Sequence, residues 1–368
     1  MELSKSLQER RYDIDWLRNF GILLLFPYHA ARIFDIWGPN YIKSTELSPT
    51  LSSFLLVAGY CFMPLLFFLA GASSWYALKK RSAAQYSKDR FYKLLIPFLF
   101  GLLIIVPPQA YLAKITHSVY NGDYITFMKG YFTDFTDLTG YLGTFTPGHL
   151  WFILYLFIIS MVALPIMIKS HNKPPIKLLR NPWIMISLFI PLTLMEFLPD
   201  LGGKNPFFFF FLFLVGFFLG KDAGVMETIH RIKFKCLLFL LPLVPGTMIL
   251  FQQNSHAGDF SAVHLLITVL KNLGVCLTLI VLIGYGNKCL NHDHAMLHYM
   301  NQAAFPVYIL HQTVMMVVGY YTVKINAGIS VRYILITFLT LILSIILYEI
   351  IRRIPGLRRL FGIKPTSH

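Results

Sequence analysis

The sequence predicts an all-α fold, a polytopic transmembrane helical bundle, because it is rich in apolar residues and poor in charge. Of its 368 residues, 56% are hydrophobic and only 13% are charged, whereas a soluble domain has roughly 25% charged residues. Runs such as LLIPFLFGLLIIV are continuous and do not alternate as the strands of a membrane barrel do. At about 20 residues for each span, ten spans use roughly 200 residues. We therefore expect a single integral membrane domain over residues 1–368, with short loops.

About ten apolar runs of helix length lie between clusters of charged residues. They cover residues 17–36, 53–77, 94–113, 149–168, 182–198, 206–220, 236–251, 263–286, 302–321 and 333–351. Sorting the 32 lysines and arginines by alternate loops places 24 on the side of both termini, six on the other side and two inside spans. The positive-inside rule then predicts that both termini are cytoplasmic. The expected location is the bacterial inner membrane, and the charged first run does not have the pattern of a cleavable signal peptide.

The first span concentrates ionisable side chains, which are costly at membrane depth and therefore indicate function. Arg18 and His29 are eleven residues apart, which returns them to nearly the same helix face at a separation of roughly 16 Å. Asp15 precedes Arg18 by three residues and can hold its guanidinium. With the amino terminus inside, Arg18 can bind an anionic donor at the cytoplasmic mouth, and His29 can act as a base farther out. The alternatives are a snorkelling arginine and a histidine hydrogen-bonded to a neighbouring helix.

The outer side offers candidate groups for binding an acceptor. The loop at 114–148 holds three aspartates and eight tyrosines or phenylalanines, a mixture that suits sugar rings but is also typical of an interfacial aromatic belt. His149 and Trp151 then open the fourth span, at the depth expected for His29. His149 can share a catalytic site with His29, or it can be an interfacial helix cap.

Three later spans carry isolated polar groups at membrane depth. Glu196, near the outer end of the fifth span, can orient a histidine or bind a sugar hydroxyl. Lys271 is deep in the eighth span and needs a partner there, which can be a donor phosphate, an acyl carboxylate or a buried ion pair. His311 and Gln312 lie near mid-depth in the ninth span, where the two roles open to them are substrate binding and an interhelix hydrogen bond.

Several other classes of site do not fit the sequence. The net charge of +15 is spread over cytoplasmic loops beside the membrane, so no nucleic-acid partner is expected. The four cysteines form no CxxC pair. His294 and His298 have the spacing of helical metal ligands but lie outside an HExxH pattern, so we expect no metal. The sequence contains no GxSxG elbow, phosphate loop or dinucleotide fingerprint.

Taken in order, five motifs resemble those of the acyltransferase-3 family of integral membrane acyltransferases. The family signature is an arginine, ten residues and a histidine, here Arg18 and His29. The other four are FFLAG at 67–71, KDRFYKLLIP at 88–97, GHLWF at 148–152 and FPVYILHQ at 305–312. Together they extend over nearly the whole chain, and the chain resembles the shorter branch that includes the periplasmic glucan succinylation proteins.

The resemblance implies transfer of an acyl group from cytoplasmic acyl-CoA to an acceptor at the outer face, most often an envelope carbohydrate or glycolipid. It makes His29 the central catalytic histidine, as a base or a transient acyl carrier, and Arg18 its essential partner. The basic stretch implies that Arg90 and Lys93 attract the donor phosphates, although the family commonly has a second arginine where this chain has lysine. The expected site residues are His29, Arg18 and His149 for catalysis, Arg18, Arg90, Lys93 and Lys271 for the donor, and Asp15, Trp151, Glu196 and His311 for the substrate.

Two other functions use the same residues. A transporter or flippase for a lipid-linked sugar would line its pathway with these intramembrane charges, but it usually has paired interrupted helices in repeated halves, which this sequence lacks. A sensor that has lost catalysis is the third alternative, and the retention of both Arg18 and His29 argues against it. The sequence does not determine the acyl chain, the acceptor or assembly into homo-oligomers.

Overall fold

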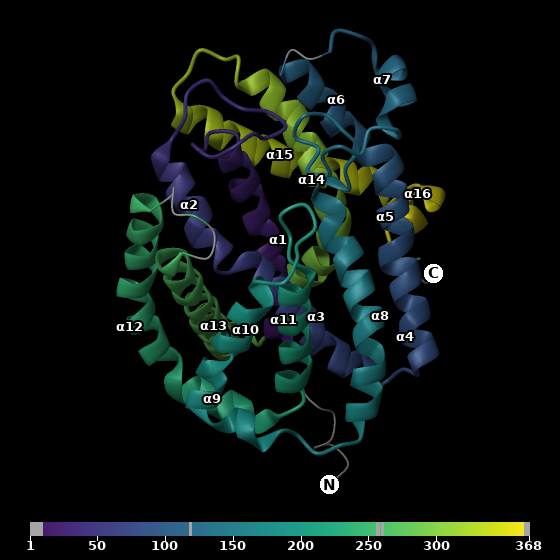
Figure 1. Cartoon of the computed structure of the whole chain (residues 1–368). Helices are drawn as coiled ribbons and strands as arrows, with labels where there is room; N and C mark the ends of the chain where they lie inside the picture. Colours follow the sequence, from purple (N-terminus) through teal and green to yellow (C-terminus); the bar gives the residue numbers. More distant parts are fainter. Residues whose placement is uncertain (1–9, 118–119, 255–257, 259–260, 364–368) are drawn as a thin grey trace.

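The computed structural model describes residues 10–117, 120–254, 258 and 261–363 (Figure 1), and no strand occurs among them. Four short 3-10 or π-helical segments are η1 (Phe91–Leu95), η2 (Gly101–Ile105), η3 (Gly148–Leu150) and η4 (Lys177–Arg180). The α-helices are α1 (Tyr12–Arg32), α2 (Pro49–Gly59), α3 (Phe62–Leu78), α4 (Ala83–Arg90), α5 (Ile96–Phe100), α6 (Pro107–Thr116), α7 (Tyr124–Tyr131), α8 (Trp151–His171), α9 (Pro182–Ser187), α10 (Phe189–Glu196), α11 (Pro206–Gly220), α12 (Ala223–Gln253), α13 (Ala262–Leu290), α14 (Ala295–Thr322), α15 (Ile329–Ile351) and α16 (Pro355–Leu360).

The predicted all-α membrane architecture is confirmed. Within the described residues, seven helical stretches are long and apolar enough to cross a membrane: Pro49–Leu78, Ala83–Thr116, Gly148–His171, Ala223–Gln253, Ala262–Leu290, Ala295–Thr322 and Ile329–Ile351. Two shorter apolar stretches, Pro182–Glu196 and Pro206–Gly220, and the charged helix α1 coincide with the other three predicted spans. The number of crossings and the orientation stay predictions, and residues 1–9 and 364–368 lie outside the described part of the chain.

The outer surface of the bundle carries large apolar side chains. Phe239 and Leu241 on α12 are 61% and 64% exposed, and Phe338 on α15 is 58% exposed. Many large apolar side chains are exposed in this way, which is unusual for a soluble monomer. In a lipid bilayer these side chains are not exposed to water, so their exposure on the bundle is consistent with a membrane protein.

Helices α3 and α11 pack backbone against backbone through two glycines. A Cβ atom on Gly71 would lie 1.9 Å from the carbonyl oxygen of Phe213, and one on Gly216 would lie 2.0 Å from that of Phe68. Only a residue without a Cβ allows this approach, as in other helix pairs in membranes. The segment FFLAG, which ends at Gly71, therefore has a packing function.

Two π-helical turns interrupt the stretch Ala83–Thr116. Segment η1 ends two residues before Pro97, and η2 ends two residues before Pro107. Proline lacks an N–H group and crowds the preceding turn, so it loosens the helix at both places. At the second turn the carbonyl oxygen of Ile105 accepts a 2.6 Å hydrogen bond from the hydroxyl of Thr313. The irregular turn thus attaches this stretch to α14.

The connection between α6 and α8 is held together by its own side chains. Asp123 caps α7 by accepting a 2.9 Å hydrogen bond from the backbone N–H of Thr126. Asp134 accepts a 2.6 Å hydrogen bond from the hydroxyl of Thr136. In the next turn, Asp137 accepts a 2.7 Å hydrogen bond from the hydroxyl of Thr139. All three carboxylates are therefore engaged in turns, and acceptor binding by this loop stays a prediction.

Helix α1 runs through the middle of the bundle (Figure 1) and contacts α2, α3, α13, α14 and α15. Helices α1 and α14 run in the same direction, because early residues of one meet early residues of the other. Arg18 contacts Asn301, and farther along His29 contacts His311. The fold therefore places Arg18 and His29 of α1 against the same partner helix.

Candidate functional site

Arg18 and His29 lie on the face of α1 that meets α14. Arg18 Nη2 donates a 2.9 Å hydrogen bond to Asn301 Oδ1. Eleven residues later, the ring of His29 lies 5.3 Å from that of His311, centroid to centroid. The shared face expected from the sequence spacing is therefore present, and the structure adds that α14 is the helix opposite it.

Arg18 is held by neighbours from both helices. Asp15 accepts a 2.7 Å hydrogen bond from Arg18, as the three-residue spacing predicts, and it also pairs with Arg10 at 3.0 Å. Asn19 donates to the same Asn301 oxygen that Arg18 uses. The Arg18 side chain nevertheless remains 36% exposed. It is thus oriented by protein and still accessible to an anionic group, while substrate binding by Asp15 stays a prediction.

His29 is partly exposed inside the bundle and makes no hydrogen bond to any described residue. Its neighbours are rings, with Tyr28 edge-on at 5.3 Å and His311 tilted at the same distance. Because both of its nitrogens are uncommitted, this imidazole can donate a proton, accept one or attack a carbonyl carbon.

His149 differs from His29 because both of its ring nitrogens are engaged. Its Nε2 lies 2.9 Å from the carbonyl oxygen of Ile309, and its Nδ1 lies 3.3 Å from Nε2 of Gln109. The hydroxyl of Tyr308 also donates to the carbonyl oxygen of His149. These bonds fasten the start of α8 to α14. The catalytic role expected for His149 stays a prediction.

His311 is completely buried and adjacent to both other histidines. Its ring centroid lies 5.3 Å from that of His29 and 5.0 Å from that of His149. Its Nδ1 lies 2.5 Å from the carbonyl oxygen of Tyr308. In the part of the chain that the structure describes, no group of three or more His, Cys, Asp or Glu could hold a metal ion. Substrate binding by His311 stays a prediction.

Gln109 belongs to this site and was not expected from the sequence. It is fully buried, and its Nε2 donates a 2.7 Å hydrogen bond to Thr313 in addition to facing His149. A glutamine directly after two prolines in an apolar span, at Pro107 and Pro108, is the sequence signal that could have identified it. Asn301 and Tyr308 are the other site residues that were not singled out.

Glu196 and Lys271 form an ion pair with each other. Asn272 donates a further 2.6 Å hydrogen bond to Glu196 Oε2. The structure therefore pairs two residues that were assigned separately to donor and acceptor, although the pair is not buried, because the side chains of Lys271 and Glu196 are 41% and 26% exposed. A binding role for either side chain stays a prediction.

The basic stretch lies on α4 and η1, which pack against α8 and, through α4, against α3. Arg90 donates a 2.9 Å hydrogen bond to the hydroxyl of Ser74, and its guanidinium lies 4.8 Å from the ring centroid of Tyr86. Lys93 lies 3.4 Å from the carboxylate of Asp89. These contacts are all within the protein. Donor binding by this stretch stays a prediction.

Trp151 lies in an aromatic group near the loop that precedes α11. Its ring packs edge-on against Tyr155 at 5.3 Å and lies 5.4 Å from Phe209. The Lys204 ammonium lies 5.7 Å from the Trp151 ring centroid. Burial, and secondarily the positive charge of Arg32, lower the pKa of Lys204. Lys204 is thus a half-buried basic side chain beside this aromatic group.

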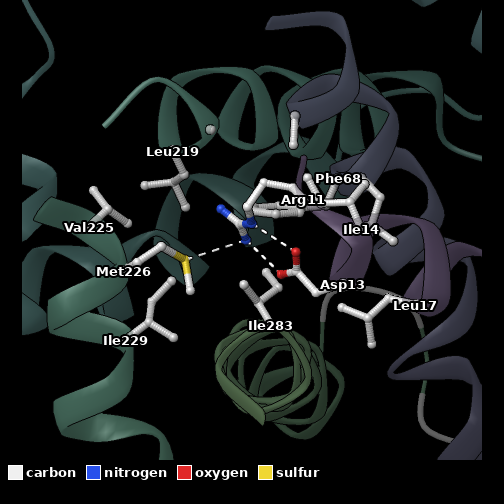
Figure 2. A pocket seen from close by; sticks show the side chains of 13 residues that line it. Arg11, Asp13, Ile14, Leu17, Phe68, Leu219, Val225, Met226, Ile229 and Ile283 are labelled. Atoms are coloured by element: carbon white, nitrogen blue, oxygen red, sulfur yellow. Dashed lines mark hydrogen bonds and ion pairs between the residues drawn. The ribbon is translucent and has the colours of Figure 1, made fainter. Parts of the chain in front are cut away.

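A small cavity at the start of α1 is too small to be a donor site. It has a volume of about 30 Å³, which is room for about two water molecules. Figure 2 shows the Arg11 guanidinium between Asp13 and Met226, with bonds to Asp13 of 2.8 Å and 2.7 Å. The Met226 contact joins this pair to α12 at the start of α1, away from His29.

Comparisons with known proteins agree with the pattern of motifs. The acyltransferase-3 family model, described as an acyltransferase domain, matches residues 11–349. The chain is similar to glucans biosynthesis protein C of Escherichia coli O1:K1, of E. coli K12 and of Shigella dysenteriae serotype 1. Each is 23% identical over 392 residues, which cover 97% of this chain and 96% of the relative. No solved structure matches the chain at a significant level.

Proposed function

The chain belongs to the acyltransferase-3 family of membrane acyltransferases, and we propose that it moves an acyl group from cytoplasmic acyl-CoA to an acceptor hydroxyl outside the bacterial inner membrane. The acceptor is an envelope carbohydrate or glycolipid, a proposal supported by relatives named for glucan biosynthesis. The observation that carries the proposal is the arrangement on α1: an accessible histidine with two uncommitted nitrogens shares a helix face with an accessible arginine.

The separation of these residues favours an elongated donor. Eleven residues of helix place Arg18 and His29 roughly 16 Å apart. A donor that bridges them needs anionic groups at one end and its reactive carbonyl at the other, and acyl-CoA has this form. Arg18 binds the anionic end by charge-assisted hydrogen bonds, and Arg90 and Lys93 add positive charge on the same predicted side of the membrane.

His29 can promote transfer by two routes. In the direct route, one nitrogen takes the proton from the acceptor hydroxyl while the hydroxyl oxygen attacks the thioester carbonyl carbon. The carbon–sulfur bond breaks, and the departing CoA thiolate takes up the proton. In the second route, the nitrogen itself attacks the carbonyl carbon and releases CoA, and the acceptor hydroxyl then cleaves the acyl-imidazole. Acid quenching followed by mass analysis of the His29 peptide distinguishes the two routes.

The test is turnover by the purified full chain in lipid nanodiscs, with a panel of acyl-CoAs and oligosaccharide acceptors. We expect His29→Gln to lower CoA release and acceptor acylation by about 10²- to 10⁴-fold, the contribution of an acid–base group. The control is His298→Gln, because His298 is half exposed and pairs with Asp293 at the end of α14 that is remote from His311. Wild-type rates in His29→Gln would overturn the proposal. Movement of a lipid-linked sugar without CoA release would favour the transporter alternative.

A further inference from the structure

His311 carries a buried nitrogen atom that no described residue satisfies. Its Nδ1 faces the carbonyl oxygen of Tyr308, and because a carbonyl can only accept, Nδ1 holds the proton. The other nitrogen, Nε2, is then a lone-pair acceptor. It is sealed from solvent and has no hydrogen-bond partner within the described part of the chain. Buried acceptors are nearly always paired, so this atom calls for an explanation.

His29 is the neighbour that can supply the missing proton. The two ring centroids are 5.3 Å apart and the planes are inclined by 45°. At this separation, facing nitrogens of two imidazoles reach the hydrogen-bond distance of about 3 Å after a small rotation of one ring. No hydrogen bond to a described residue opposes such a rotation of His29. Catalytic hydrogen bonds are often long before substrate binds and tighten only in the reactive complex.

His149 is excluded as the partner because neither of its nitrogens has a proton to give. Its Nε2–H is used by the carbonyl oxygen of Ile309, and its Nδ1 is the acceptor that faces Gln109. An accepting nitrogen cannot satisfy another accepting nitrogen. His149, which Gln109 holds, packs edge-on against His311, and the unpaired acceptor is left for His29.

We propose that His311 is the positioning residue for His29 in acyl transfer. Its Nε2 accepts a hydrogen bond from one N–H of His29, which fixes the tautomer and aims the other His29 nitrogen at the reacting groups. When that nitrogen takes up a proton, the His311 lone pair stabilises the resulting imidazolium, as the third member of a catalytic triad does. This proposal rests on the proposed function, in which His29 is the reacting group.

Two substitutions separate this role from a purely structural one. In His311→Asn, the short amide stands near the place of Nδ1, so it can keep the bond to Tyr308 but offers no acceptor to His29. In His311→Gln, the longer amide stands near the place of Nε2, so it keeps an acceptor but gives up the bond to Tyr308. A structural role predicts that Asn is the better replacement, whereas a positioning role predicts that Gln is.

The first measurement is kcat and KM for acyl transfer by the purified full chain, with thermal unfolding of each variant as the check on folding. We expect His311→Asn to lower kcat by about 10-fold or more, with KM within about twofold of wild type, and His311→Gln to restore most of the loss. Equal kcat values in wild type and His311→Asn, or a better rescue by Asn than by Gln, would overturn the proposal.

The second measurement does not depend on turnover. Nitrogen-15 NMR of histidine-labelled protein, with the His29 signals identified by their loss in His29→Gln, reports which His29 nitrogen holds the proton. We expect one dominant tautomer in wild type and a mixture in His311→Asn. Identical tautomer populations would overturn the His311 proposal. Absence of CoA release from wild type would overturn the proposed function instead, and the tautomer measurement would still decide the contact.

Discussion

Arg18 and Asn301 are joined by a 2.9 Å hydrogen bond between the guanidinium and the amide oxygen, across the interface of two helices that run in the same direction. Asn19 donates to the same oxygen. The amide of Asn301 thus fixes the direction of Arg18, and α14 carries groups that orient both ends of the predicted site, Asn301 for Arg18 and His311 for His29.

Replacement of Asn301 by alanine is expected to weaken donor binding more than chemistry. The loss of a hydrogen bond to a charged group costs about 1.5–3 kcal/mol, so KM for acyl-CoA should rise by at least about 10-fold while kcat changes less. Steady-state kinetics with the full chain measure both quantities. Asn172→Ala, at the exposed end of α8, is the control, and an unchanged KM in Asn301→Ala would contradict the prediction.

Replacement of Arg18 by lysine is expected to keep part of the donor affinity and replacement by glutamine to remove most of it. Lysine retains the positive charge, but it lacks the planar guanidinium that can donate to Asp15, Asn301 and an anionic group at the same time. Calorimetric titration with CoA should give a dissociation constant raised about 10-fold for lysine and further for glutamine. Equal affinities of all three proteins for CoA would show that Arg18 does not bind the donor.

Replacement of Gly71 by alanine is expected to destabilise the bundle. Its new methyl group would overlap the carbonyl oxygen of Phe213, and such overpacking typically costs about 1–3 kcal/mol. Gly246→Ala on α12 is the matched control, because nothing lies within 4 Å of its added Cβ atom and helix propensity gains about 0.5–1 kcal/mol there. Denaturant unfolding measures both, and the same sign of effect at the two glycines would contradict the packing argument.

The Glu196–Lys271 pair is expected to show energetic coupling. Glu196→Gln and Lys271→Met each leave one charge without its partner, whereas the double variant removes both charges. The two single effects on the free energy of unfolding should therefore sum to about 0.5–1 kcal/mol more than the effect of the double variant. A rise in KM for acyl-CoA in Lys271→Met alone would instead support the donor-binding role predicted from the sequence.

Lys204 is expected to destabilise the folded protein at neutral pH. Its pKa is lowered in the folded protein below the ordinary value of 10.5, so the unfolded chain binds more protons between the two values and stability rises with pH across that interval. Lys204→Met should therefore raise the melting temperature at pH 7.5, and its advantage should shrink as pH approaches 10.5. Lys129→Met, on α7, is the control. A stability gain in Lys204→Met that does not change with pH would contradict the lowered pKa of Lys204.

Much of the architecture follows from the sequence alone. Long apolar runs can satisfy their backbone groups in lipid only as helices, so composition and run length predict an all-α membrane bundle. Helical periodicity places Arg18 and His29 on one face, and the three-residue spacing predicts the Asp15–Arg18 bond. These features are local, because they depend on residues within one helix.

The tertiary structure decided which helix meets that face and which polar groups are already paired. Glu196 and Lys271 are 75 residues apart and each has a separate role in the sequence, yet they neutralise each other in the fold. His149 and His29 look alike as outer-side histidines, but only His149 has both nitrogens bonded. Periodicity fixes the direction of a side chain on its own helix, whereas its partner is set by the packing of segments distant in sequence.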